Sequence, residues 1–361
     1  MHDYQPLTIA DVKRETVDAI TLLLAVPPSL ADSYRFAPGQ HIPVRAVVAG
    51  DELRRTYSIS SGPDDAHLAI TIKRLGNGRF SAWAHANLKP GMTLDAMPPQ
   101  GRFVLAPGDG TSRHILSLAA GAGITPIMAM LRHALDREPE TRFTLIYGNR
   151  SMSDAIFGEA LEDLKDLHIG RFALVHVVSR EESDSPLLAG RITAATLAEI
   201  MKGIGEPASI AHAYLCGPGN MIRDLRNALM AMGLPRERVH HEFFAPVAGA
   251  APAQTQLAST PETATAAIAN AVAIIDGARH RLAIAPGETV LDAAIRSGLR
   301  VPFSCKAGMC CTCRARIVEG KAAMRVNYSL EPWEIERGFT LTCQTIPDAA
   351  AGRLVVDYDA M

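Results

Sequence analysis

The chain has 361 residues, more than one ordinary hydrophobic core accommodates, so two or three domains are expected. Its hydrophobic content of 48% is that of a globular protein. A formal net charge of −2 and an aromatic content of 5% argue against a nucleic-acid-binding protein and against a protein of anionic membrane surfaces.

Cysteine usage and the apolar segments indicate a cytoplasmic protein. Five of the six cysteines cluster near the C-terminus instead of forming a spread disulfide framework, which favours a reducing compartment. The first six residues lack the basic and apolar regions of an export signal. The apolar stretch 115–131 contains Gly121, Gly123 and Pro126, which favour a strand, a loop and a helix over a membrane span.

Residues 1–108 are predicted to form an antiparallel β-barrel, because short apolar-rich runs such as Val17–Leu24 and His67–Arg74 are separated by proline and glycine. A chemical motif, R-x-Y-S, follows one predicted strand at Arg55–Ser58. Its arginine could bind a phosphate, its tyrosine could stack on an isoalloxazine ring, and its serine could hydrogen-bond to flavin N5. On its own, this string is more typical of an edge strand with alternating polar residues.

A second candidate flavin element follows at Gly78-Arg-Phe-Ser81. Gly78 and Ser81 would lie at the start of a helix, where unpaired backbone N–H groups bind phosphate. The two strings together predict a flavin site on the barrel.

Residues 112–246 are predicted to form an α/β domain with a parallel sheet, because apolar strands alternate with helical segments. The first strand runs into Gly121-Ala-Gly123-Ile-Thr125-Pro126, where Thr125 is expected as the N-cap and Pro126 in the first helical turn. These glycines and unpaired N–H groups favour a dinucleotide pyrophosphate site over a simple tight turn.

Two later strands end in residues with possible roles at the same edge of the sheet. Ser179 and Arg180 could hold a ribose 2′-phosphate, which would favour NADPH over NADH, or could form a solvated turn. Cys216 precedes Gly217-Pro218 at the end of another strand, and could be a ligand-edge residue or a buried apolar thiol.

The segment 247–267 is predicted to be a linker, since it has few large apolar residues and no period that could build a core. Residues 268–361 are predicted to form a small α+β unit of the β-grasp type. Asp276-Gly277 provides a hairpin turn, Thr289 a helix N-cap and Gly298 a helix stop.

Four cysteines of this unit have the spacing C-x4-C-x2-C…C: Cys305, Cys310, Cys313 and, thirty residues on, Cys343. This is the plant-type spacing for a [2Fe–2S] cluster, which needs four thiolates. A structural zinc site also uses four thiolates, but usually shows two C-x2-C pairs. Cys311 fills the spacing and is expected not to be a ligand.

The strings in this order resemble the ferredoxin–NADP⁺ reductase superfamily with a plant-type ferredoxin fused at the C-terminus. Within it, Tyr147–Arg150, Met324–Pro332 and Leu341–Pro347 resemble the reductase components of phenylacetyl-CoA epoxidases, which serve phenylacetate catabolism.

The resemblance implies the cofactors FAD, a [2Fe–2S] cluster and NADPH, with NADH possible. Tyr57, Ser58 and Cys216 are then expected as catalytic residues. The implied cofactor-binding residues are Arg55, Tyr57, Ser58, Lys73, Gly78, Ser81, Gly121, Gly123, Thr125, Ser179 and Arg180. The aromatic pair Phe243-Phe244 corresponds to a tail that often covers the flavin in this family.

The implied function is electron transfer from NADPH through FAD and the cluster to a multicomponent oxygenase, here the diiron component of a phenylacetyl-CoA epoxidase. A second interpretation is the reductase of a ring-hydroxylating oxygenase. A third is a cluster-based redox sensor, and the simplest is a zinc-binding scaffold. No nucleic-acid or membrane partner is expected.

Overall fold

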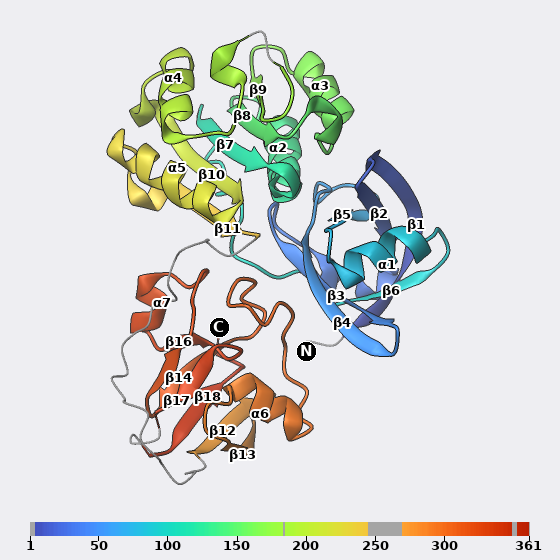
Figure 1. Cartoon of the computed structure of the whole chain (residues 1–361), viewed down its shortest axis with the longest axis vertical. Coiled ribbons are helices and arrows are strands. Elements are labelled where there is room, and N and C mark those ends of the chain that lie inside the picture. The colour runs from blue at the N-terminus through green and yellow to red at the C-terminus, as the bar shows by residue number, and fades with distance from the viewer. Residues whose placement is uncertain (1–3, 183–184, 245–268, 349–351, 361) are drawn as a thin grey trace. The chain divides into compact units, whose positions relative to one another are not determined.

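The structure is a computed structural model that describes residues 4–182, 185–244, 269–348 and 352–360 (Figure 1). The chain divides into two compact units, one spanning Tyr4–Ala248 and the other containing Gly249–Met361. The predicted linker 247–267 lies outside the described residues. In the described part of the chain, no helix is long and apolar enough to cross a membrane.

The first unit begins with a six-stranded antiparallel sheet in the order β4-β3-β6-β1-β2-β5. Ile59, just after β4, forms an antiparallel bridge with Ile70 of β5, so the sheet closes into the predicted barrel. Its core is fully buried and aliphatic, with Leu7, Leu22 and Ile42 at 0% exposure. The elements are β1 (Gln5–Thr16), β2 (Ala19–Ala25), β3 (His41–Val48), β4 (Asp51–Ser58), β5 (Leu68–Lys73), α1 (Arg79–Asn87) and β6 (Thr93–Ala96).

The apolar-rich run Val17–Leu24 begins in a turn and continues into β2. Val17 and Asp18 form the turn between β1 and β2, and the Thr16 hydroxyl donates to the Asp18 carboxylate at 3.0 Å. Asp18 therefore lies at the end of a hairpin, with its carboxylate available to cations from other elements.

The same unit continues with a five-stranded parallel sheet in the order β11-β10-β7-β8-β9. Helices α2 and α3 contribute to one core and α4 and α5 to another, so both faces of the sheet are covered. The chain order reverses between β7 and β10, the place where open α/β sheets bind ligands. The elements are β7 (His114–Ala120), α2 (Ile124–Arg137), β8 (Arg142–Asn149), α3 (Gly158–Leu167), β9 (Phe172–Val178), α4 (Ala194–Ile204), β10 (Ile210–Gly217), α5 (Gly219–Ala231) and β11 (Val239–Phe243).

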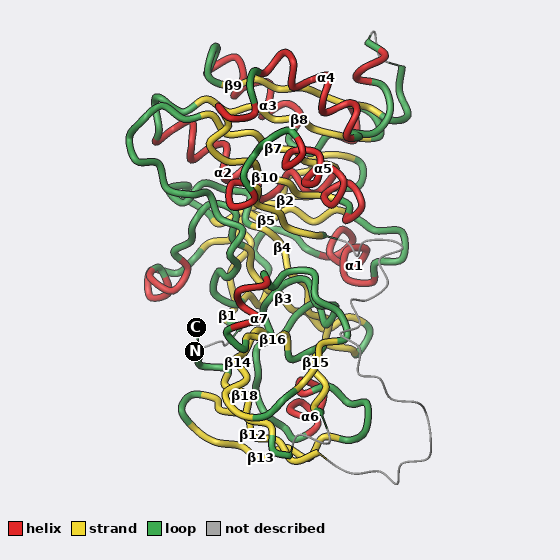
Figure 2. The backbone as a smooth tube through the Cα atoms, turned by 90° about the vertical axis from the view of Figure 1, so that its left-hand side faces the viewer, coloured by secondary structure: helices red, strands yellow, loops and turns green. Residues whose placement is uncertain are grey.

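The second unit is a mixed five-stranded sheet, β13-β12-β18-β14-β16, with two short helices and a two-stranded ribbon, β15-β17 (Figure 2). The predicted Asp276-Gly277 hairpin is confirmed, since both residues have positive φ and Ile275 pairs with Ala278. Thr289 caps α6 by accepting the Asp292 N–H at 3.1 Å. The elements are β12 (Ala269–Ile275), β13 (Ala278–Ile284), α6 (Val290–Arg296), β14 (Arg314–Glu319), β15 (Ala322–Met324), α7 (Pro332–Glu336), β16 (Phe339–Leu341), β17 (Thr345–Pro347) and β18 (Leu354–Asp357). The three predicted architectures are all present.

Candidate functional site

Strand β4 carries the three residues of the predicted flavin motif at its end. Arg55 is exposed, and its Nη1 donates to the Arg54 carbonyl at 2.6 Å. The Tyr57 ring is half-buried at 5.9 Å from the Phe80 ring, and burial raises the pKa of its hydroxyl. Ser58 is buried at 4% exposure. A half-buried ring flanked by an exposed cation and a buried hydroxyl is a donor set that fits a flavin nucleotide.

The turn before α1 is built around Gly78 and Ser81. The Ser81 hydroxyl donates to the Gly78 carbonyl and accepts the Leu75 N–H, both at 3.1 Å. A Cβ on Gly78 would overlap this hydroxyl, so only glycine fits there. The Ser81 hydroxyl thus holds the turn, and the first N–H groups of α1 are the donors left for a pyrophosphate.

The Gly121-Ala-Gly123 segment folds into a 3₁₀ turn that continues directly into α2. Gly121 has a φ of +52°, and a Cβ on Gly123 would overlap the Cys216 carbonyl and lie 2.8 Å from the Gly217 nitrogen. Both glycines are therefore required by the backbone. They bring the start of α2 against the end of β10, at the reversal point of the sheet.

The expectation that Thr125 is the N-cap of α2 was wrong, because the N-cap is Gly123 and the helix begins at Ile124. The 3₁₀ turn already has helical geometry, so the helix starts earlier than the Thr-Pro pair suggests. Thr125 is buried, and its hydroxyl donates to the Ala122 carbonyl at 3.0 Å. Its side chain therefore stabilises the glycine turn.

Lys73, at the end of barrel strand β5, reaches this turn. Its Nζ lies 3.9 Å from the position of a Cβ on Gly121 and 3.8 Å from Asp18 Oδ2. The same Asp18 oxygen accepts from Arg150 at 3.1 Å, and Arg150 also pairs with Asp154 at 2.9 Å. Because the Asp18 carboxylate contacts both cations, it fixes the Lys73 ammonium beside the glycine turn.

Ser179 and Arg180 follow β9 at the carboxyl edge of the sheet, and both side chains are exposed. The Ser179 hydroxyl donates to the Asn149 carbonyl at 3.2 Å, and the Arg180 N–H donates to the Arg150 carbonyl at 2.7 Å. These bonds place Ser179 and Arg180 beside Arg150. The result is a cationic corner that fits a phosphate.

Cys216 lies in β10 with no exposed surface. Burial, and secondarily the Glu242 carboxylate, raise the pKa of its thiol well above the usual range. Both interpretations of this residue thus apply in part: the thiol is buried, and it lies next to the last residue of its strand.

Two residues that the sequence analysis missed join Ser58 and Cys216. Glu242 of β11 lies opposite Cys216 in the sheet register, and its Oε2 accepts from the Ser58 hydroxyl at 3.4 Å. Its Oε1 lies 3.5 Å from Nδ1 of buried His41 in β3. The barrel and the parallel sheet therefore share a cluster of a hydroxyl, a carboxylate, an imidazole and a thiol, in which the carboxylate is partly exposed and the other three groups are buried. The sequence signal was weak: one acidic residue before the Phe243-Phe244 pair.

In the second unit, the four predicted cluster ligands converge as two pairs. The Cys310 thiol donates to Cys305, which lowers the pKa of Cys305 to about 5 and raises that of Cys310. The Cys313 thiol donates to Cys343 in the same way and lowers the pKa of Cys343. In the described residues, no three His, Cys, Asp or Glu side chains gather as ligands of a single ion. Two pairs of thiols match the requirement of two irons that each bind two cysteines.

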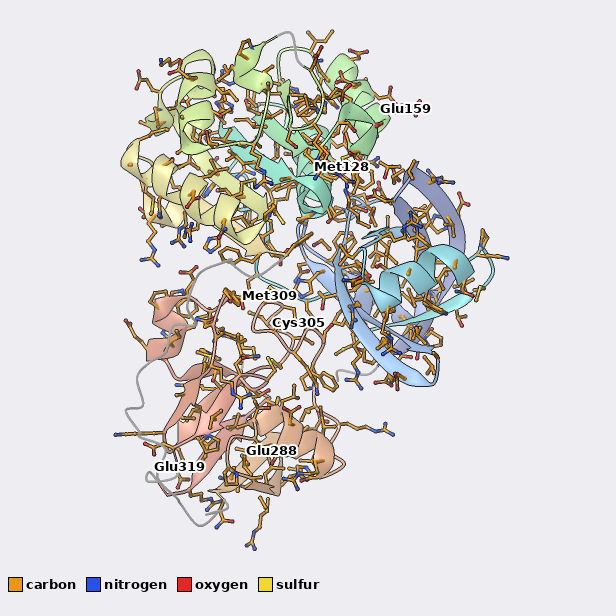
Figure 3. All side chains as sticks on the ribbon, in the orientation of Figure 1. Met128, Glu159, Glu288, Cys305, Met309 and Glu319 are labelled. Carbon is orange, nitrogen blue, oxygen red and sulfur yellow. The ribbon has the colours of Figure 1, made fainter. Side chains whose placement is uncertain are left out.

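The loop that carries three of these cysteines has unusual backbone conformations; Cys305 and Met309 of this loop are labelled in Figure 3. Lys306, Gly308 and Cys311 have φ values of +51°, +74° and +54°. These conformations turn N–H groups toward the sulfurs: the Ala307 N–H donates to Cys305 Sγ at 3.4 Å. Cys311 instead turns its thiol to the Ser329 hydroxyl at 3.0 Å, in agreement with its expected role as a non-ligand.

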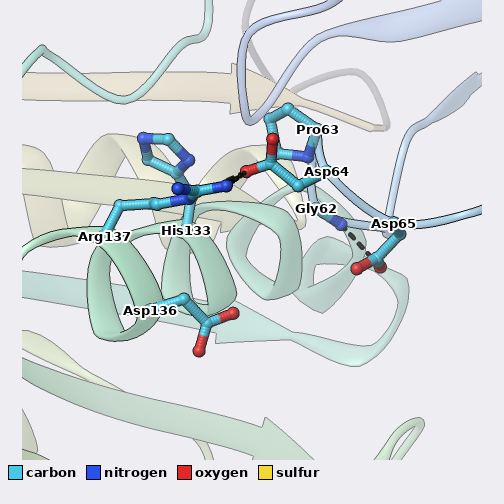
Figure 4. Close-up of a pocket in the computed structure, with 7 residues that line it drawn as sticks. All are labelled: Gly62, Pro63, Asp64, Asp65, His133, Asp136 and Arg137. Atoms are coloured by element: carbon cyan, nitrogen blue, oxygen red, sulfur yellow. Dashed lines mark hydrogen bonds and ion pairs between the residues drawn. The ribbon is translucent and has the colours of Figure 1, made fainter.

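A further cavity of about 250 Å³ lies in the first unit (Figure 4). It is lined by Gly62, Pro63, Asp64, Asp65, His133, Asp136 and Arg137. The Arg137–Asp64 pair at 2.7 Å and the Arg132–Asp65 pair at 3.4 Å hold the 62–65 turn against α2. None of the predicted site residues lines this cavity, so it is separate from the candidate sites.

Three family models match the chain, and together they cover most of it. The oxidoreductase FAD-binding domain matches residues 6–105, the oxidoreductase NAD-binding domain matches residues 118–227, and the 2Fe-2S iron-sulfur cluster binding domain matches residues 273–348. The matches agree with the barrel, the parallel sheet and the cysteine-bearing unit. The chain thus has binding domains for FAD, NAD(P)H and a [2Fe–2S] cluster.

Known proteins match the chain over nearly its whole length. The chain is 39% identical to a subunit of the 1,2-phenylacetyl-CoA epoxidase of Escherichia coli (strain K12), over 100% of this chain and 99% of the relative. It is 33% identical to the ferredoxin reductase component of 3-ketosteroid-9-alpha-monooxygenase of Rhodococcus rhodochrous, over 94% and 93%. The crystal structure of phthalate dioxygenase reductase shares the fold over 98% of each chain, with a TM-score of 0.59 and 22% identity. The chain therefore belongs to the family of oxygenase reductases, NAD(P)H-dependent oxidoreductases that join an FAD-binding barrel, an NAD-binding α/β domain and a [2Fe–2S] domain in one polypeptide.

Proposed function

We propose that this chain takes electrons from NADPH and delivers them singly, through FAD and a [2Fe–2S] cluster, to the oxygenase component of a phenylacetyl-CoA epoxidase. The observation that carries the proposal is the full-length, 39% identity to a subunit of such an epoxidase. When bound, the flavin accepts an electron pair and releases single electrons, and the cluster carries one at a time. We assign domains to residues 1–108, 112–246 and 268–361, with 247–267 as the linker.

The cluster of Ser58, Glu242, His41 and Cys216 has a part in this function. Ser58 is the last residue of the flavin motif, and the Cys216 carbonyl lies against Gly123 of the glycine turn, so the two residues mark where the flavin and nicotinamide rings would meet. The Glu242 carboxylate holds the Ser58 hydroxyl in place and is itself held by His41. We assign Tyr57, Ser58 and Cys216 to ring contacts, and Glu242 and His41 to positioning.

The phosphates of the two nucleotides have separate binding groups in this proposal. Arg55 and the first N–H groups of α1, next to Gly78 and Ser81, bind the FAD phosphates. The turn of Gly121, Gly123 and Thr125, with Lys73 above it, binds the NADPH pyrophosphate. Ser179 and Arg180 bind the 2′-phosphate. The thiolates of the two cysteine pairs bind the cluster: Cys305, Cys310, Cys313 and Cys343.

The cysteines also bear on location. Among the described residues none of the six cysteines forms a disulfide, and four of them form the proposed cluster site, which requires thiolates that stay reduced. A cytoplasmic location follows as part of the proposal.

An anaerobic titration with NADPH tests the proposal as a whole. The purified protein is expected to show flavin and iron–sulfur absorption and to take up three electrons per chain, two in the flavin and one in the cluster. Turnover is then reconstituted with the epoxidase component and, in parallel, with a ring-hydroxylating oxygenase. If NADPH oxidation led to product only with the ring-hydroxylating oxygenase, the chain would be assigned to that other class of oxygenase.

The 2′-phosphate assignment predicts a change in coenzyme preference. Arg180→Ala is expected to raise KM for NADPH about tenfold to hundredfold and to leave KM for NADH nearly unchanged, because a hydrogen bond to a charged group contributes about 1.5–3 kcal/mol. Steady-state ferricyanide reduction with each coenzyme measures both constants. Arg150→Ala is the matched variant: if it shifts the preference and Arg180→Ala does not, the 2′-phosphate contact belongs to Arg150.

A further inference from the structure

Gln344, the residue after the fourth cysteine, connects the two halves of the cluster site. Its side chain is buried at 7% exposure. Its Nε2 donates to the Lys306 carbonyl at 3.0 Å and to Cys343 Sγ at 3.5 Å, a normal length for a bond to sulfur. A primary amide has two N–H groups, so one side chain can make both bonds at once.

The backbone around Gln344 fixes the direction of this amide. The Gln344 N–H donates to the Leu341 carbonyl at 2.8 Å, and the Gln344 carbonyl accepts from the Arg325 N–H at 2.9 Å. A Cβ on Gly308 would lie 3.3 Å from Gln344 Cγ, so the ligand loop packs directly on the side chain. The amide therefore has little freedom to point elsewhere.

The acceptor at Lys306 matters because of its place in the loop. Lys306 follows the proposed ligand Cys305 and is held at a φ of +51°, a conformation that is unfavourable for a non-glycine residue. A hydrogen bond to its carbonyl stabilises this conformation. The same side chain thus supports the loop of the first three cysteines and contacts the fourth.

The bond to Cys343 has an electrostatic consequence. A hydrogen-bond donor favours the more negative state of its acceptor, and the Gln344 amide donates to Cys343 Sγ. Reduction of a thiolate-bound cluster adds a further negative charge, and hydrogen bonds to the sulfurs are one determinant of the reduction potential. The amide should therefore favour the reduced cluster.

We propose that Gln344 is a positioning residue that ties the 305–313 loop to Cys343 and makes the cluster easier to reduce. The proposal rests on the assignment of the four cysteines to a [2Fe–2S] cluster. It adds a side-chain donor to the backbone N–H groups of the loop, and it depends on the distances to Lys306 and Cys343 together with the burial of the amide.

The test uses full-length protein with three substitutions. Gln344→Leu removes both bonds at similar volume, and Gln344→Glu keeps the shape but replaces the donor with an acceptor. Thr340→Val is the matched control, since Thr340 is equally buried and bonds to Thr345 at 2.6 Å instead of to a sulfur. The midpoint potential is measured by dye-mediated titration, together with the EPR spectrum of the reduced cluster and the rate of iron loss to a chelator.

Gln344→Leu is expected to lower the equilibrium constant for one-electron reduction about tenfold, equivalent to about 59 mV. Gln344→Glu is expected to lower it further, and both should lose iron faster than Thr340→Val. If Gln344→Leu and the wild type have the same midpoint potential, the proposal is overturned while the cluster assignment stands. If one Gln344 variant loses the cluster and Thr340→Val keeps it, the positioning role of Gln344 is supported. The midpoint potential of the remaining Gln344 variant then decides whether the amide makes the cluster easier to reduce. If wild-type protein itself contains no iron and acid-labile sulfide, the proposed function fails first.

Discussion

Replacing Cys343 with serine is expected to give a protein that keeps its flavin but holds no stable [2Fe–2S] cluster. Cys343 is one half of a thiol pair and, among the four proposed ligands, the one that lies outside the 305–313 loop. Substitution of residues that only support a metal ligand costs about 10–100-fold, so loss of a ligand should cost at least roughly 100-fold in cluster retention. Reduction of the oxygenase should fall accordingly. NADPH-dependent ferricyanide reduction should stay close to the wild-type rate, because the flavin and nicotinamide residues belong to the other compact unit.

Cys311→Ser is the matched control. Cys311 lies in the same loop and is half-buried, but its thiol contacts Ser329. Iron and acid-labile sulfide contents, visible absorption and both electron-acceptor assays should be unchanged in this variant. If Cys311→Ser lost the cluster and Cys343→Ser kept it, the ligand set would have to be revised.

The convergence of the four cysteines could be predicted from the sequence because most of the information is local, and their role as cluster ligands stays a prediction. Three of the cysteines lie within nine residues, and few sites in proteins need that spacing. The strand, glycine turn and helix at 114–137 were predictable for the same reason, because the backbone of the turn leaves no room, or no allowed conformation, for a larger residue at its glycines. Helix boundaries were less certain, as Thr125 shows, since a 3₁₀ turn and an α-helix use similar backbone angles.

The contact between Ser58 and Glu242 could not be predicted in this way. The two residues are 184 positions apart, and they meet only because the end of β11 reaches the barrel. Nothing in the string His240–Phe244 marks Glu242 as different from a surface carboxylate. Similarly, the sequence suggested Ser81 as a phosphate contact, whereas the structure engages its hydroxyl in the turn. Contacts between residues far apart in the sequence, and the hydrogen-bond partners that a hydroxyl takes, depend on packing that local sequence patterns do not encode.

Gly123→Ala is expected to slow hydride transfer from NADPH by about 10²-fold and to leave the flavin content intact. The new methyl group would overlap the Cys216 carbonyl, so the end of β10 or the start of α2 must move by on the order of 1 Å. A displacement of that size at a reacting centre costs about 10²-fold in rate. Overpacking should also reduce the free energy of unfolding by about 1–3 kcal/mol. Stopped-flow reduction of the flavin and thermal unfolding measure the two effects.

Gly203→Ala separates the local clash from a general effect of losing a glycine. Gly203 lies in α4 of the same sheet domain, and a Cβ there would meet nothing within 4 Å. This variant should reduce its flavin at the wild-type rate and gain up to about 1 kcal/mol in stability, since alanine is the better helix former. If Gly123→Ala also reduced its flavin at the wild-type rate, the assignment of the Gly121–Gly123 turn to the NADPH pyrophosphate, and that of Cys216 to a ring contact, would have to be abandoned.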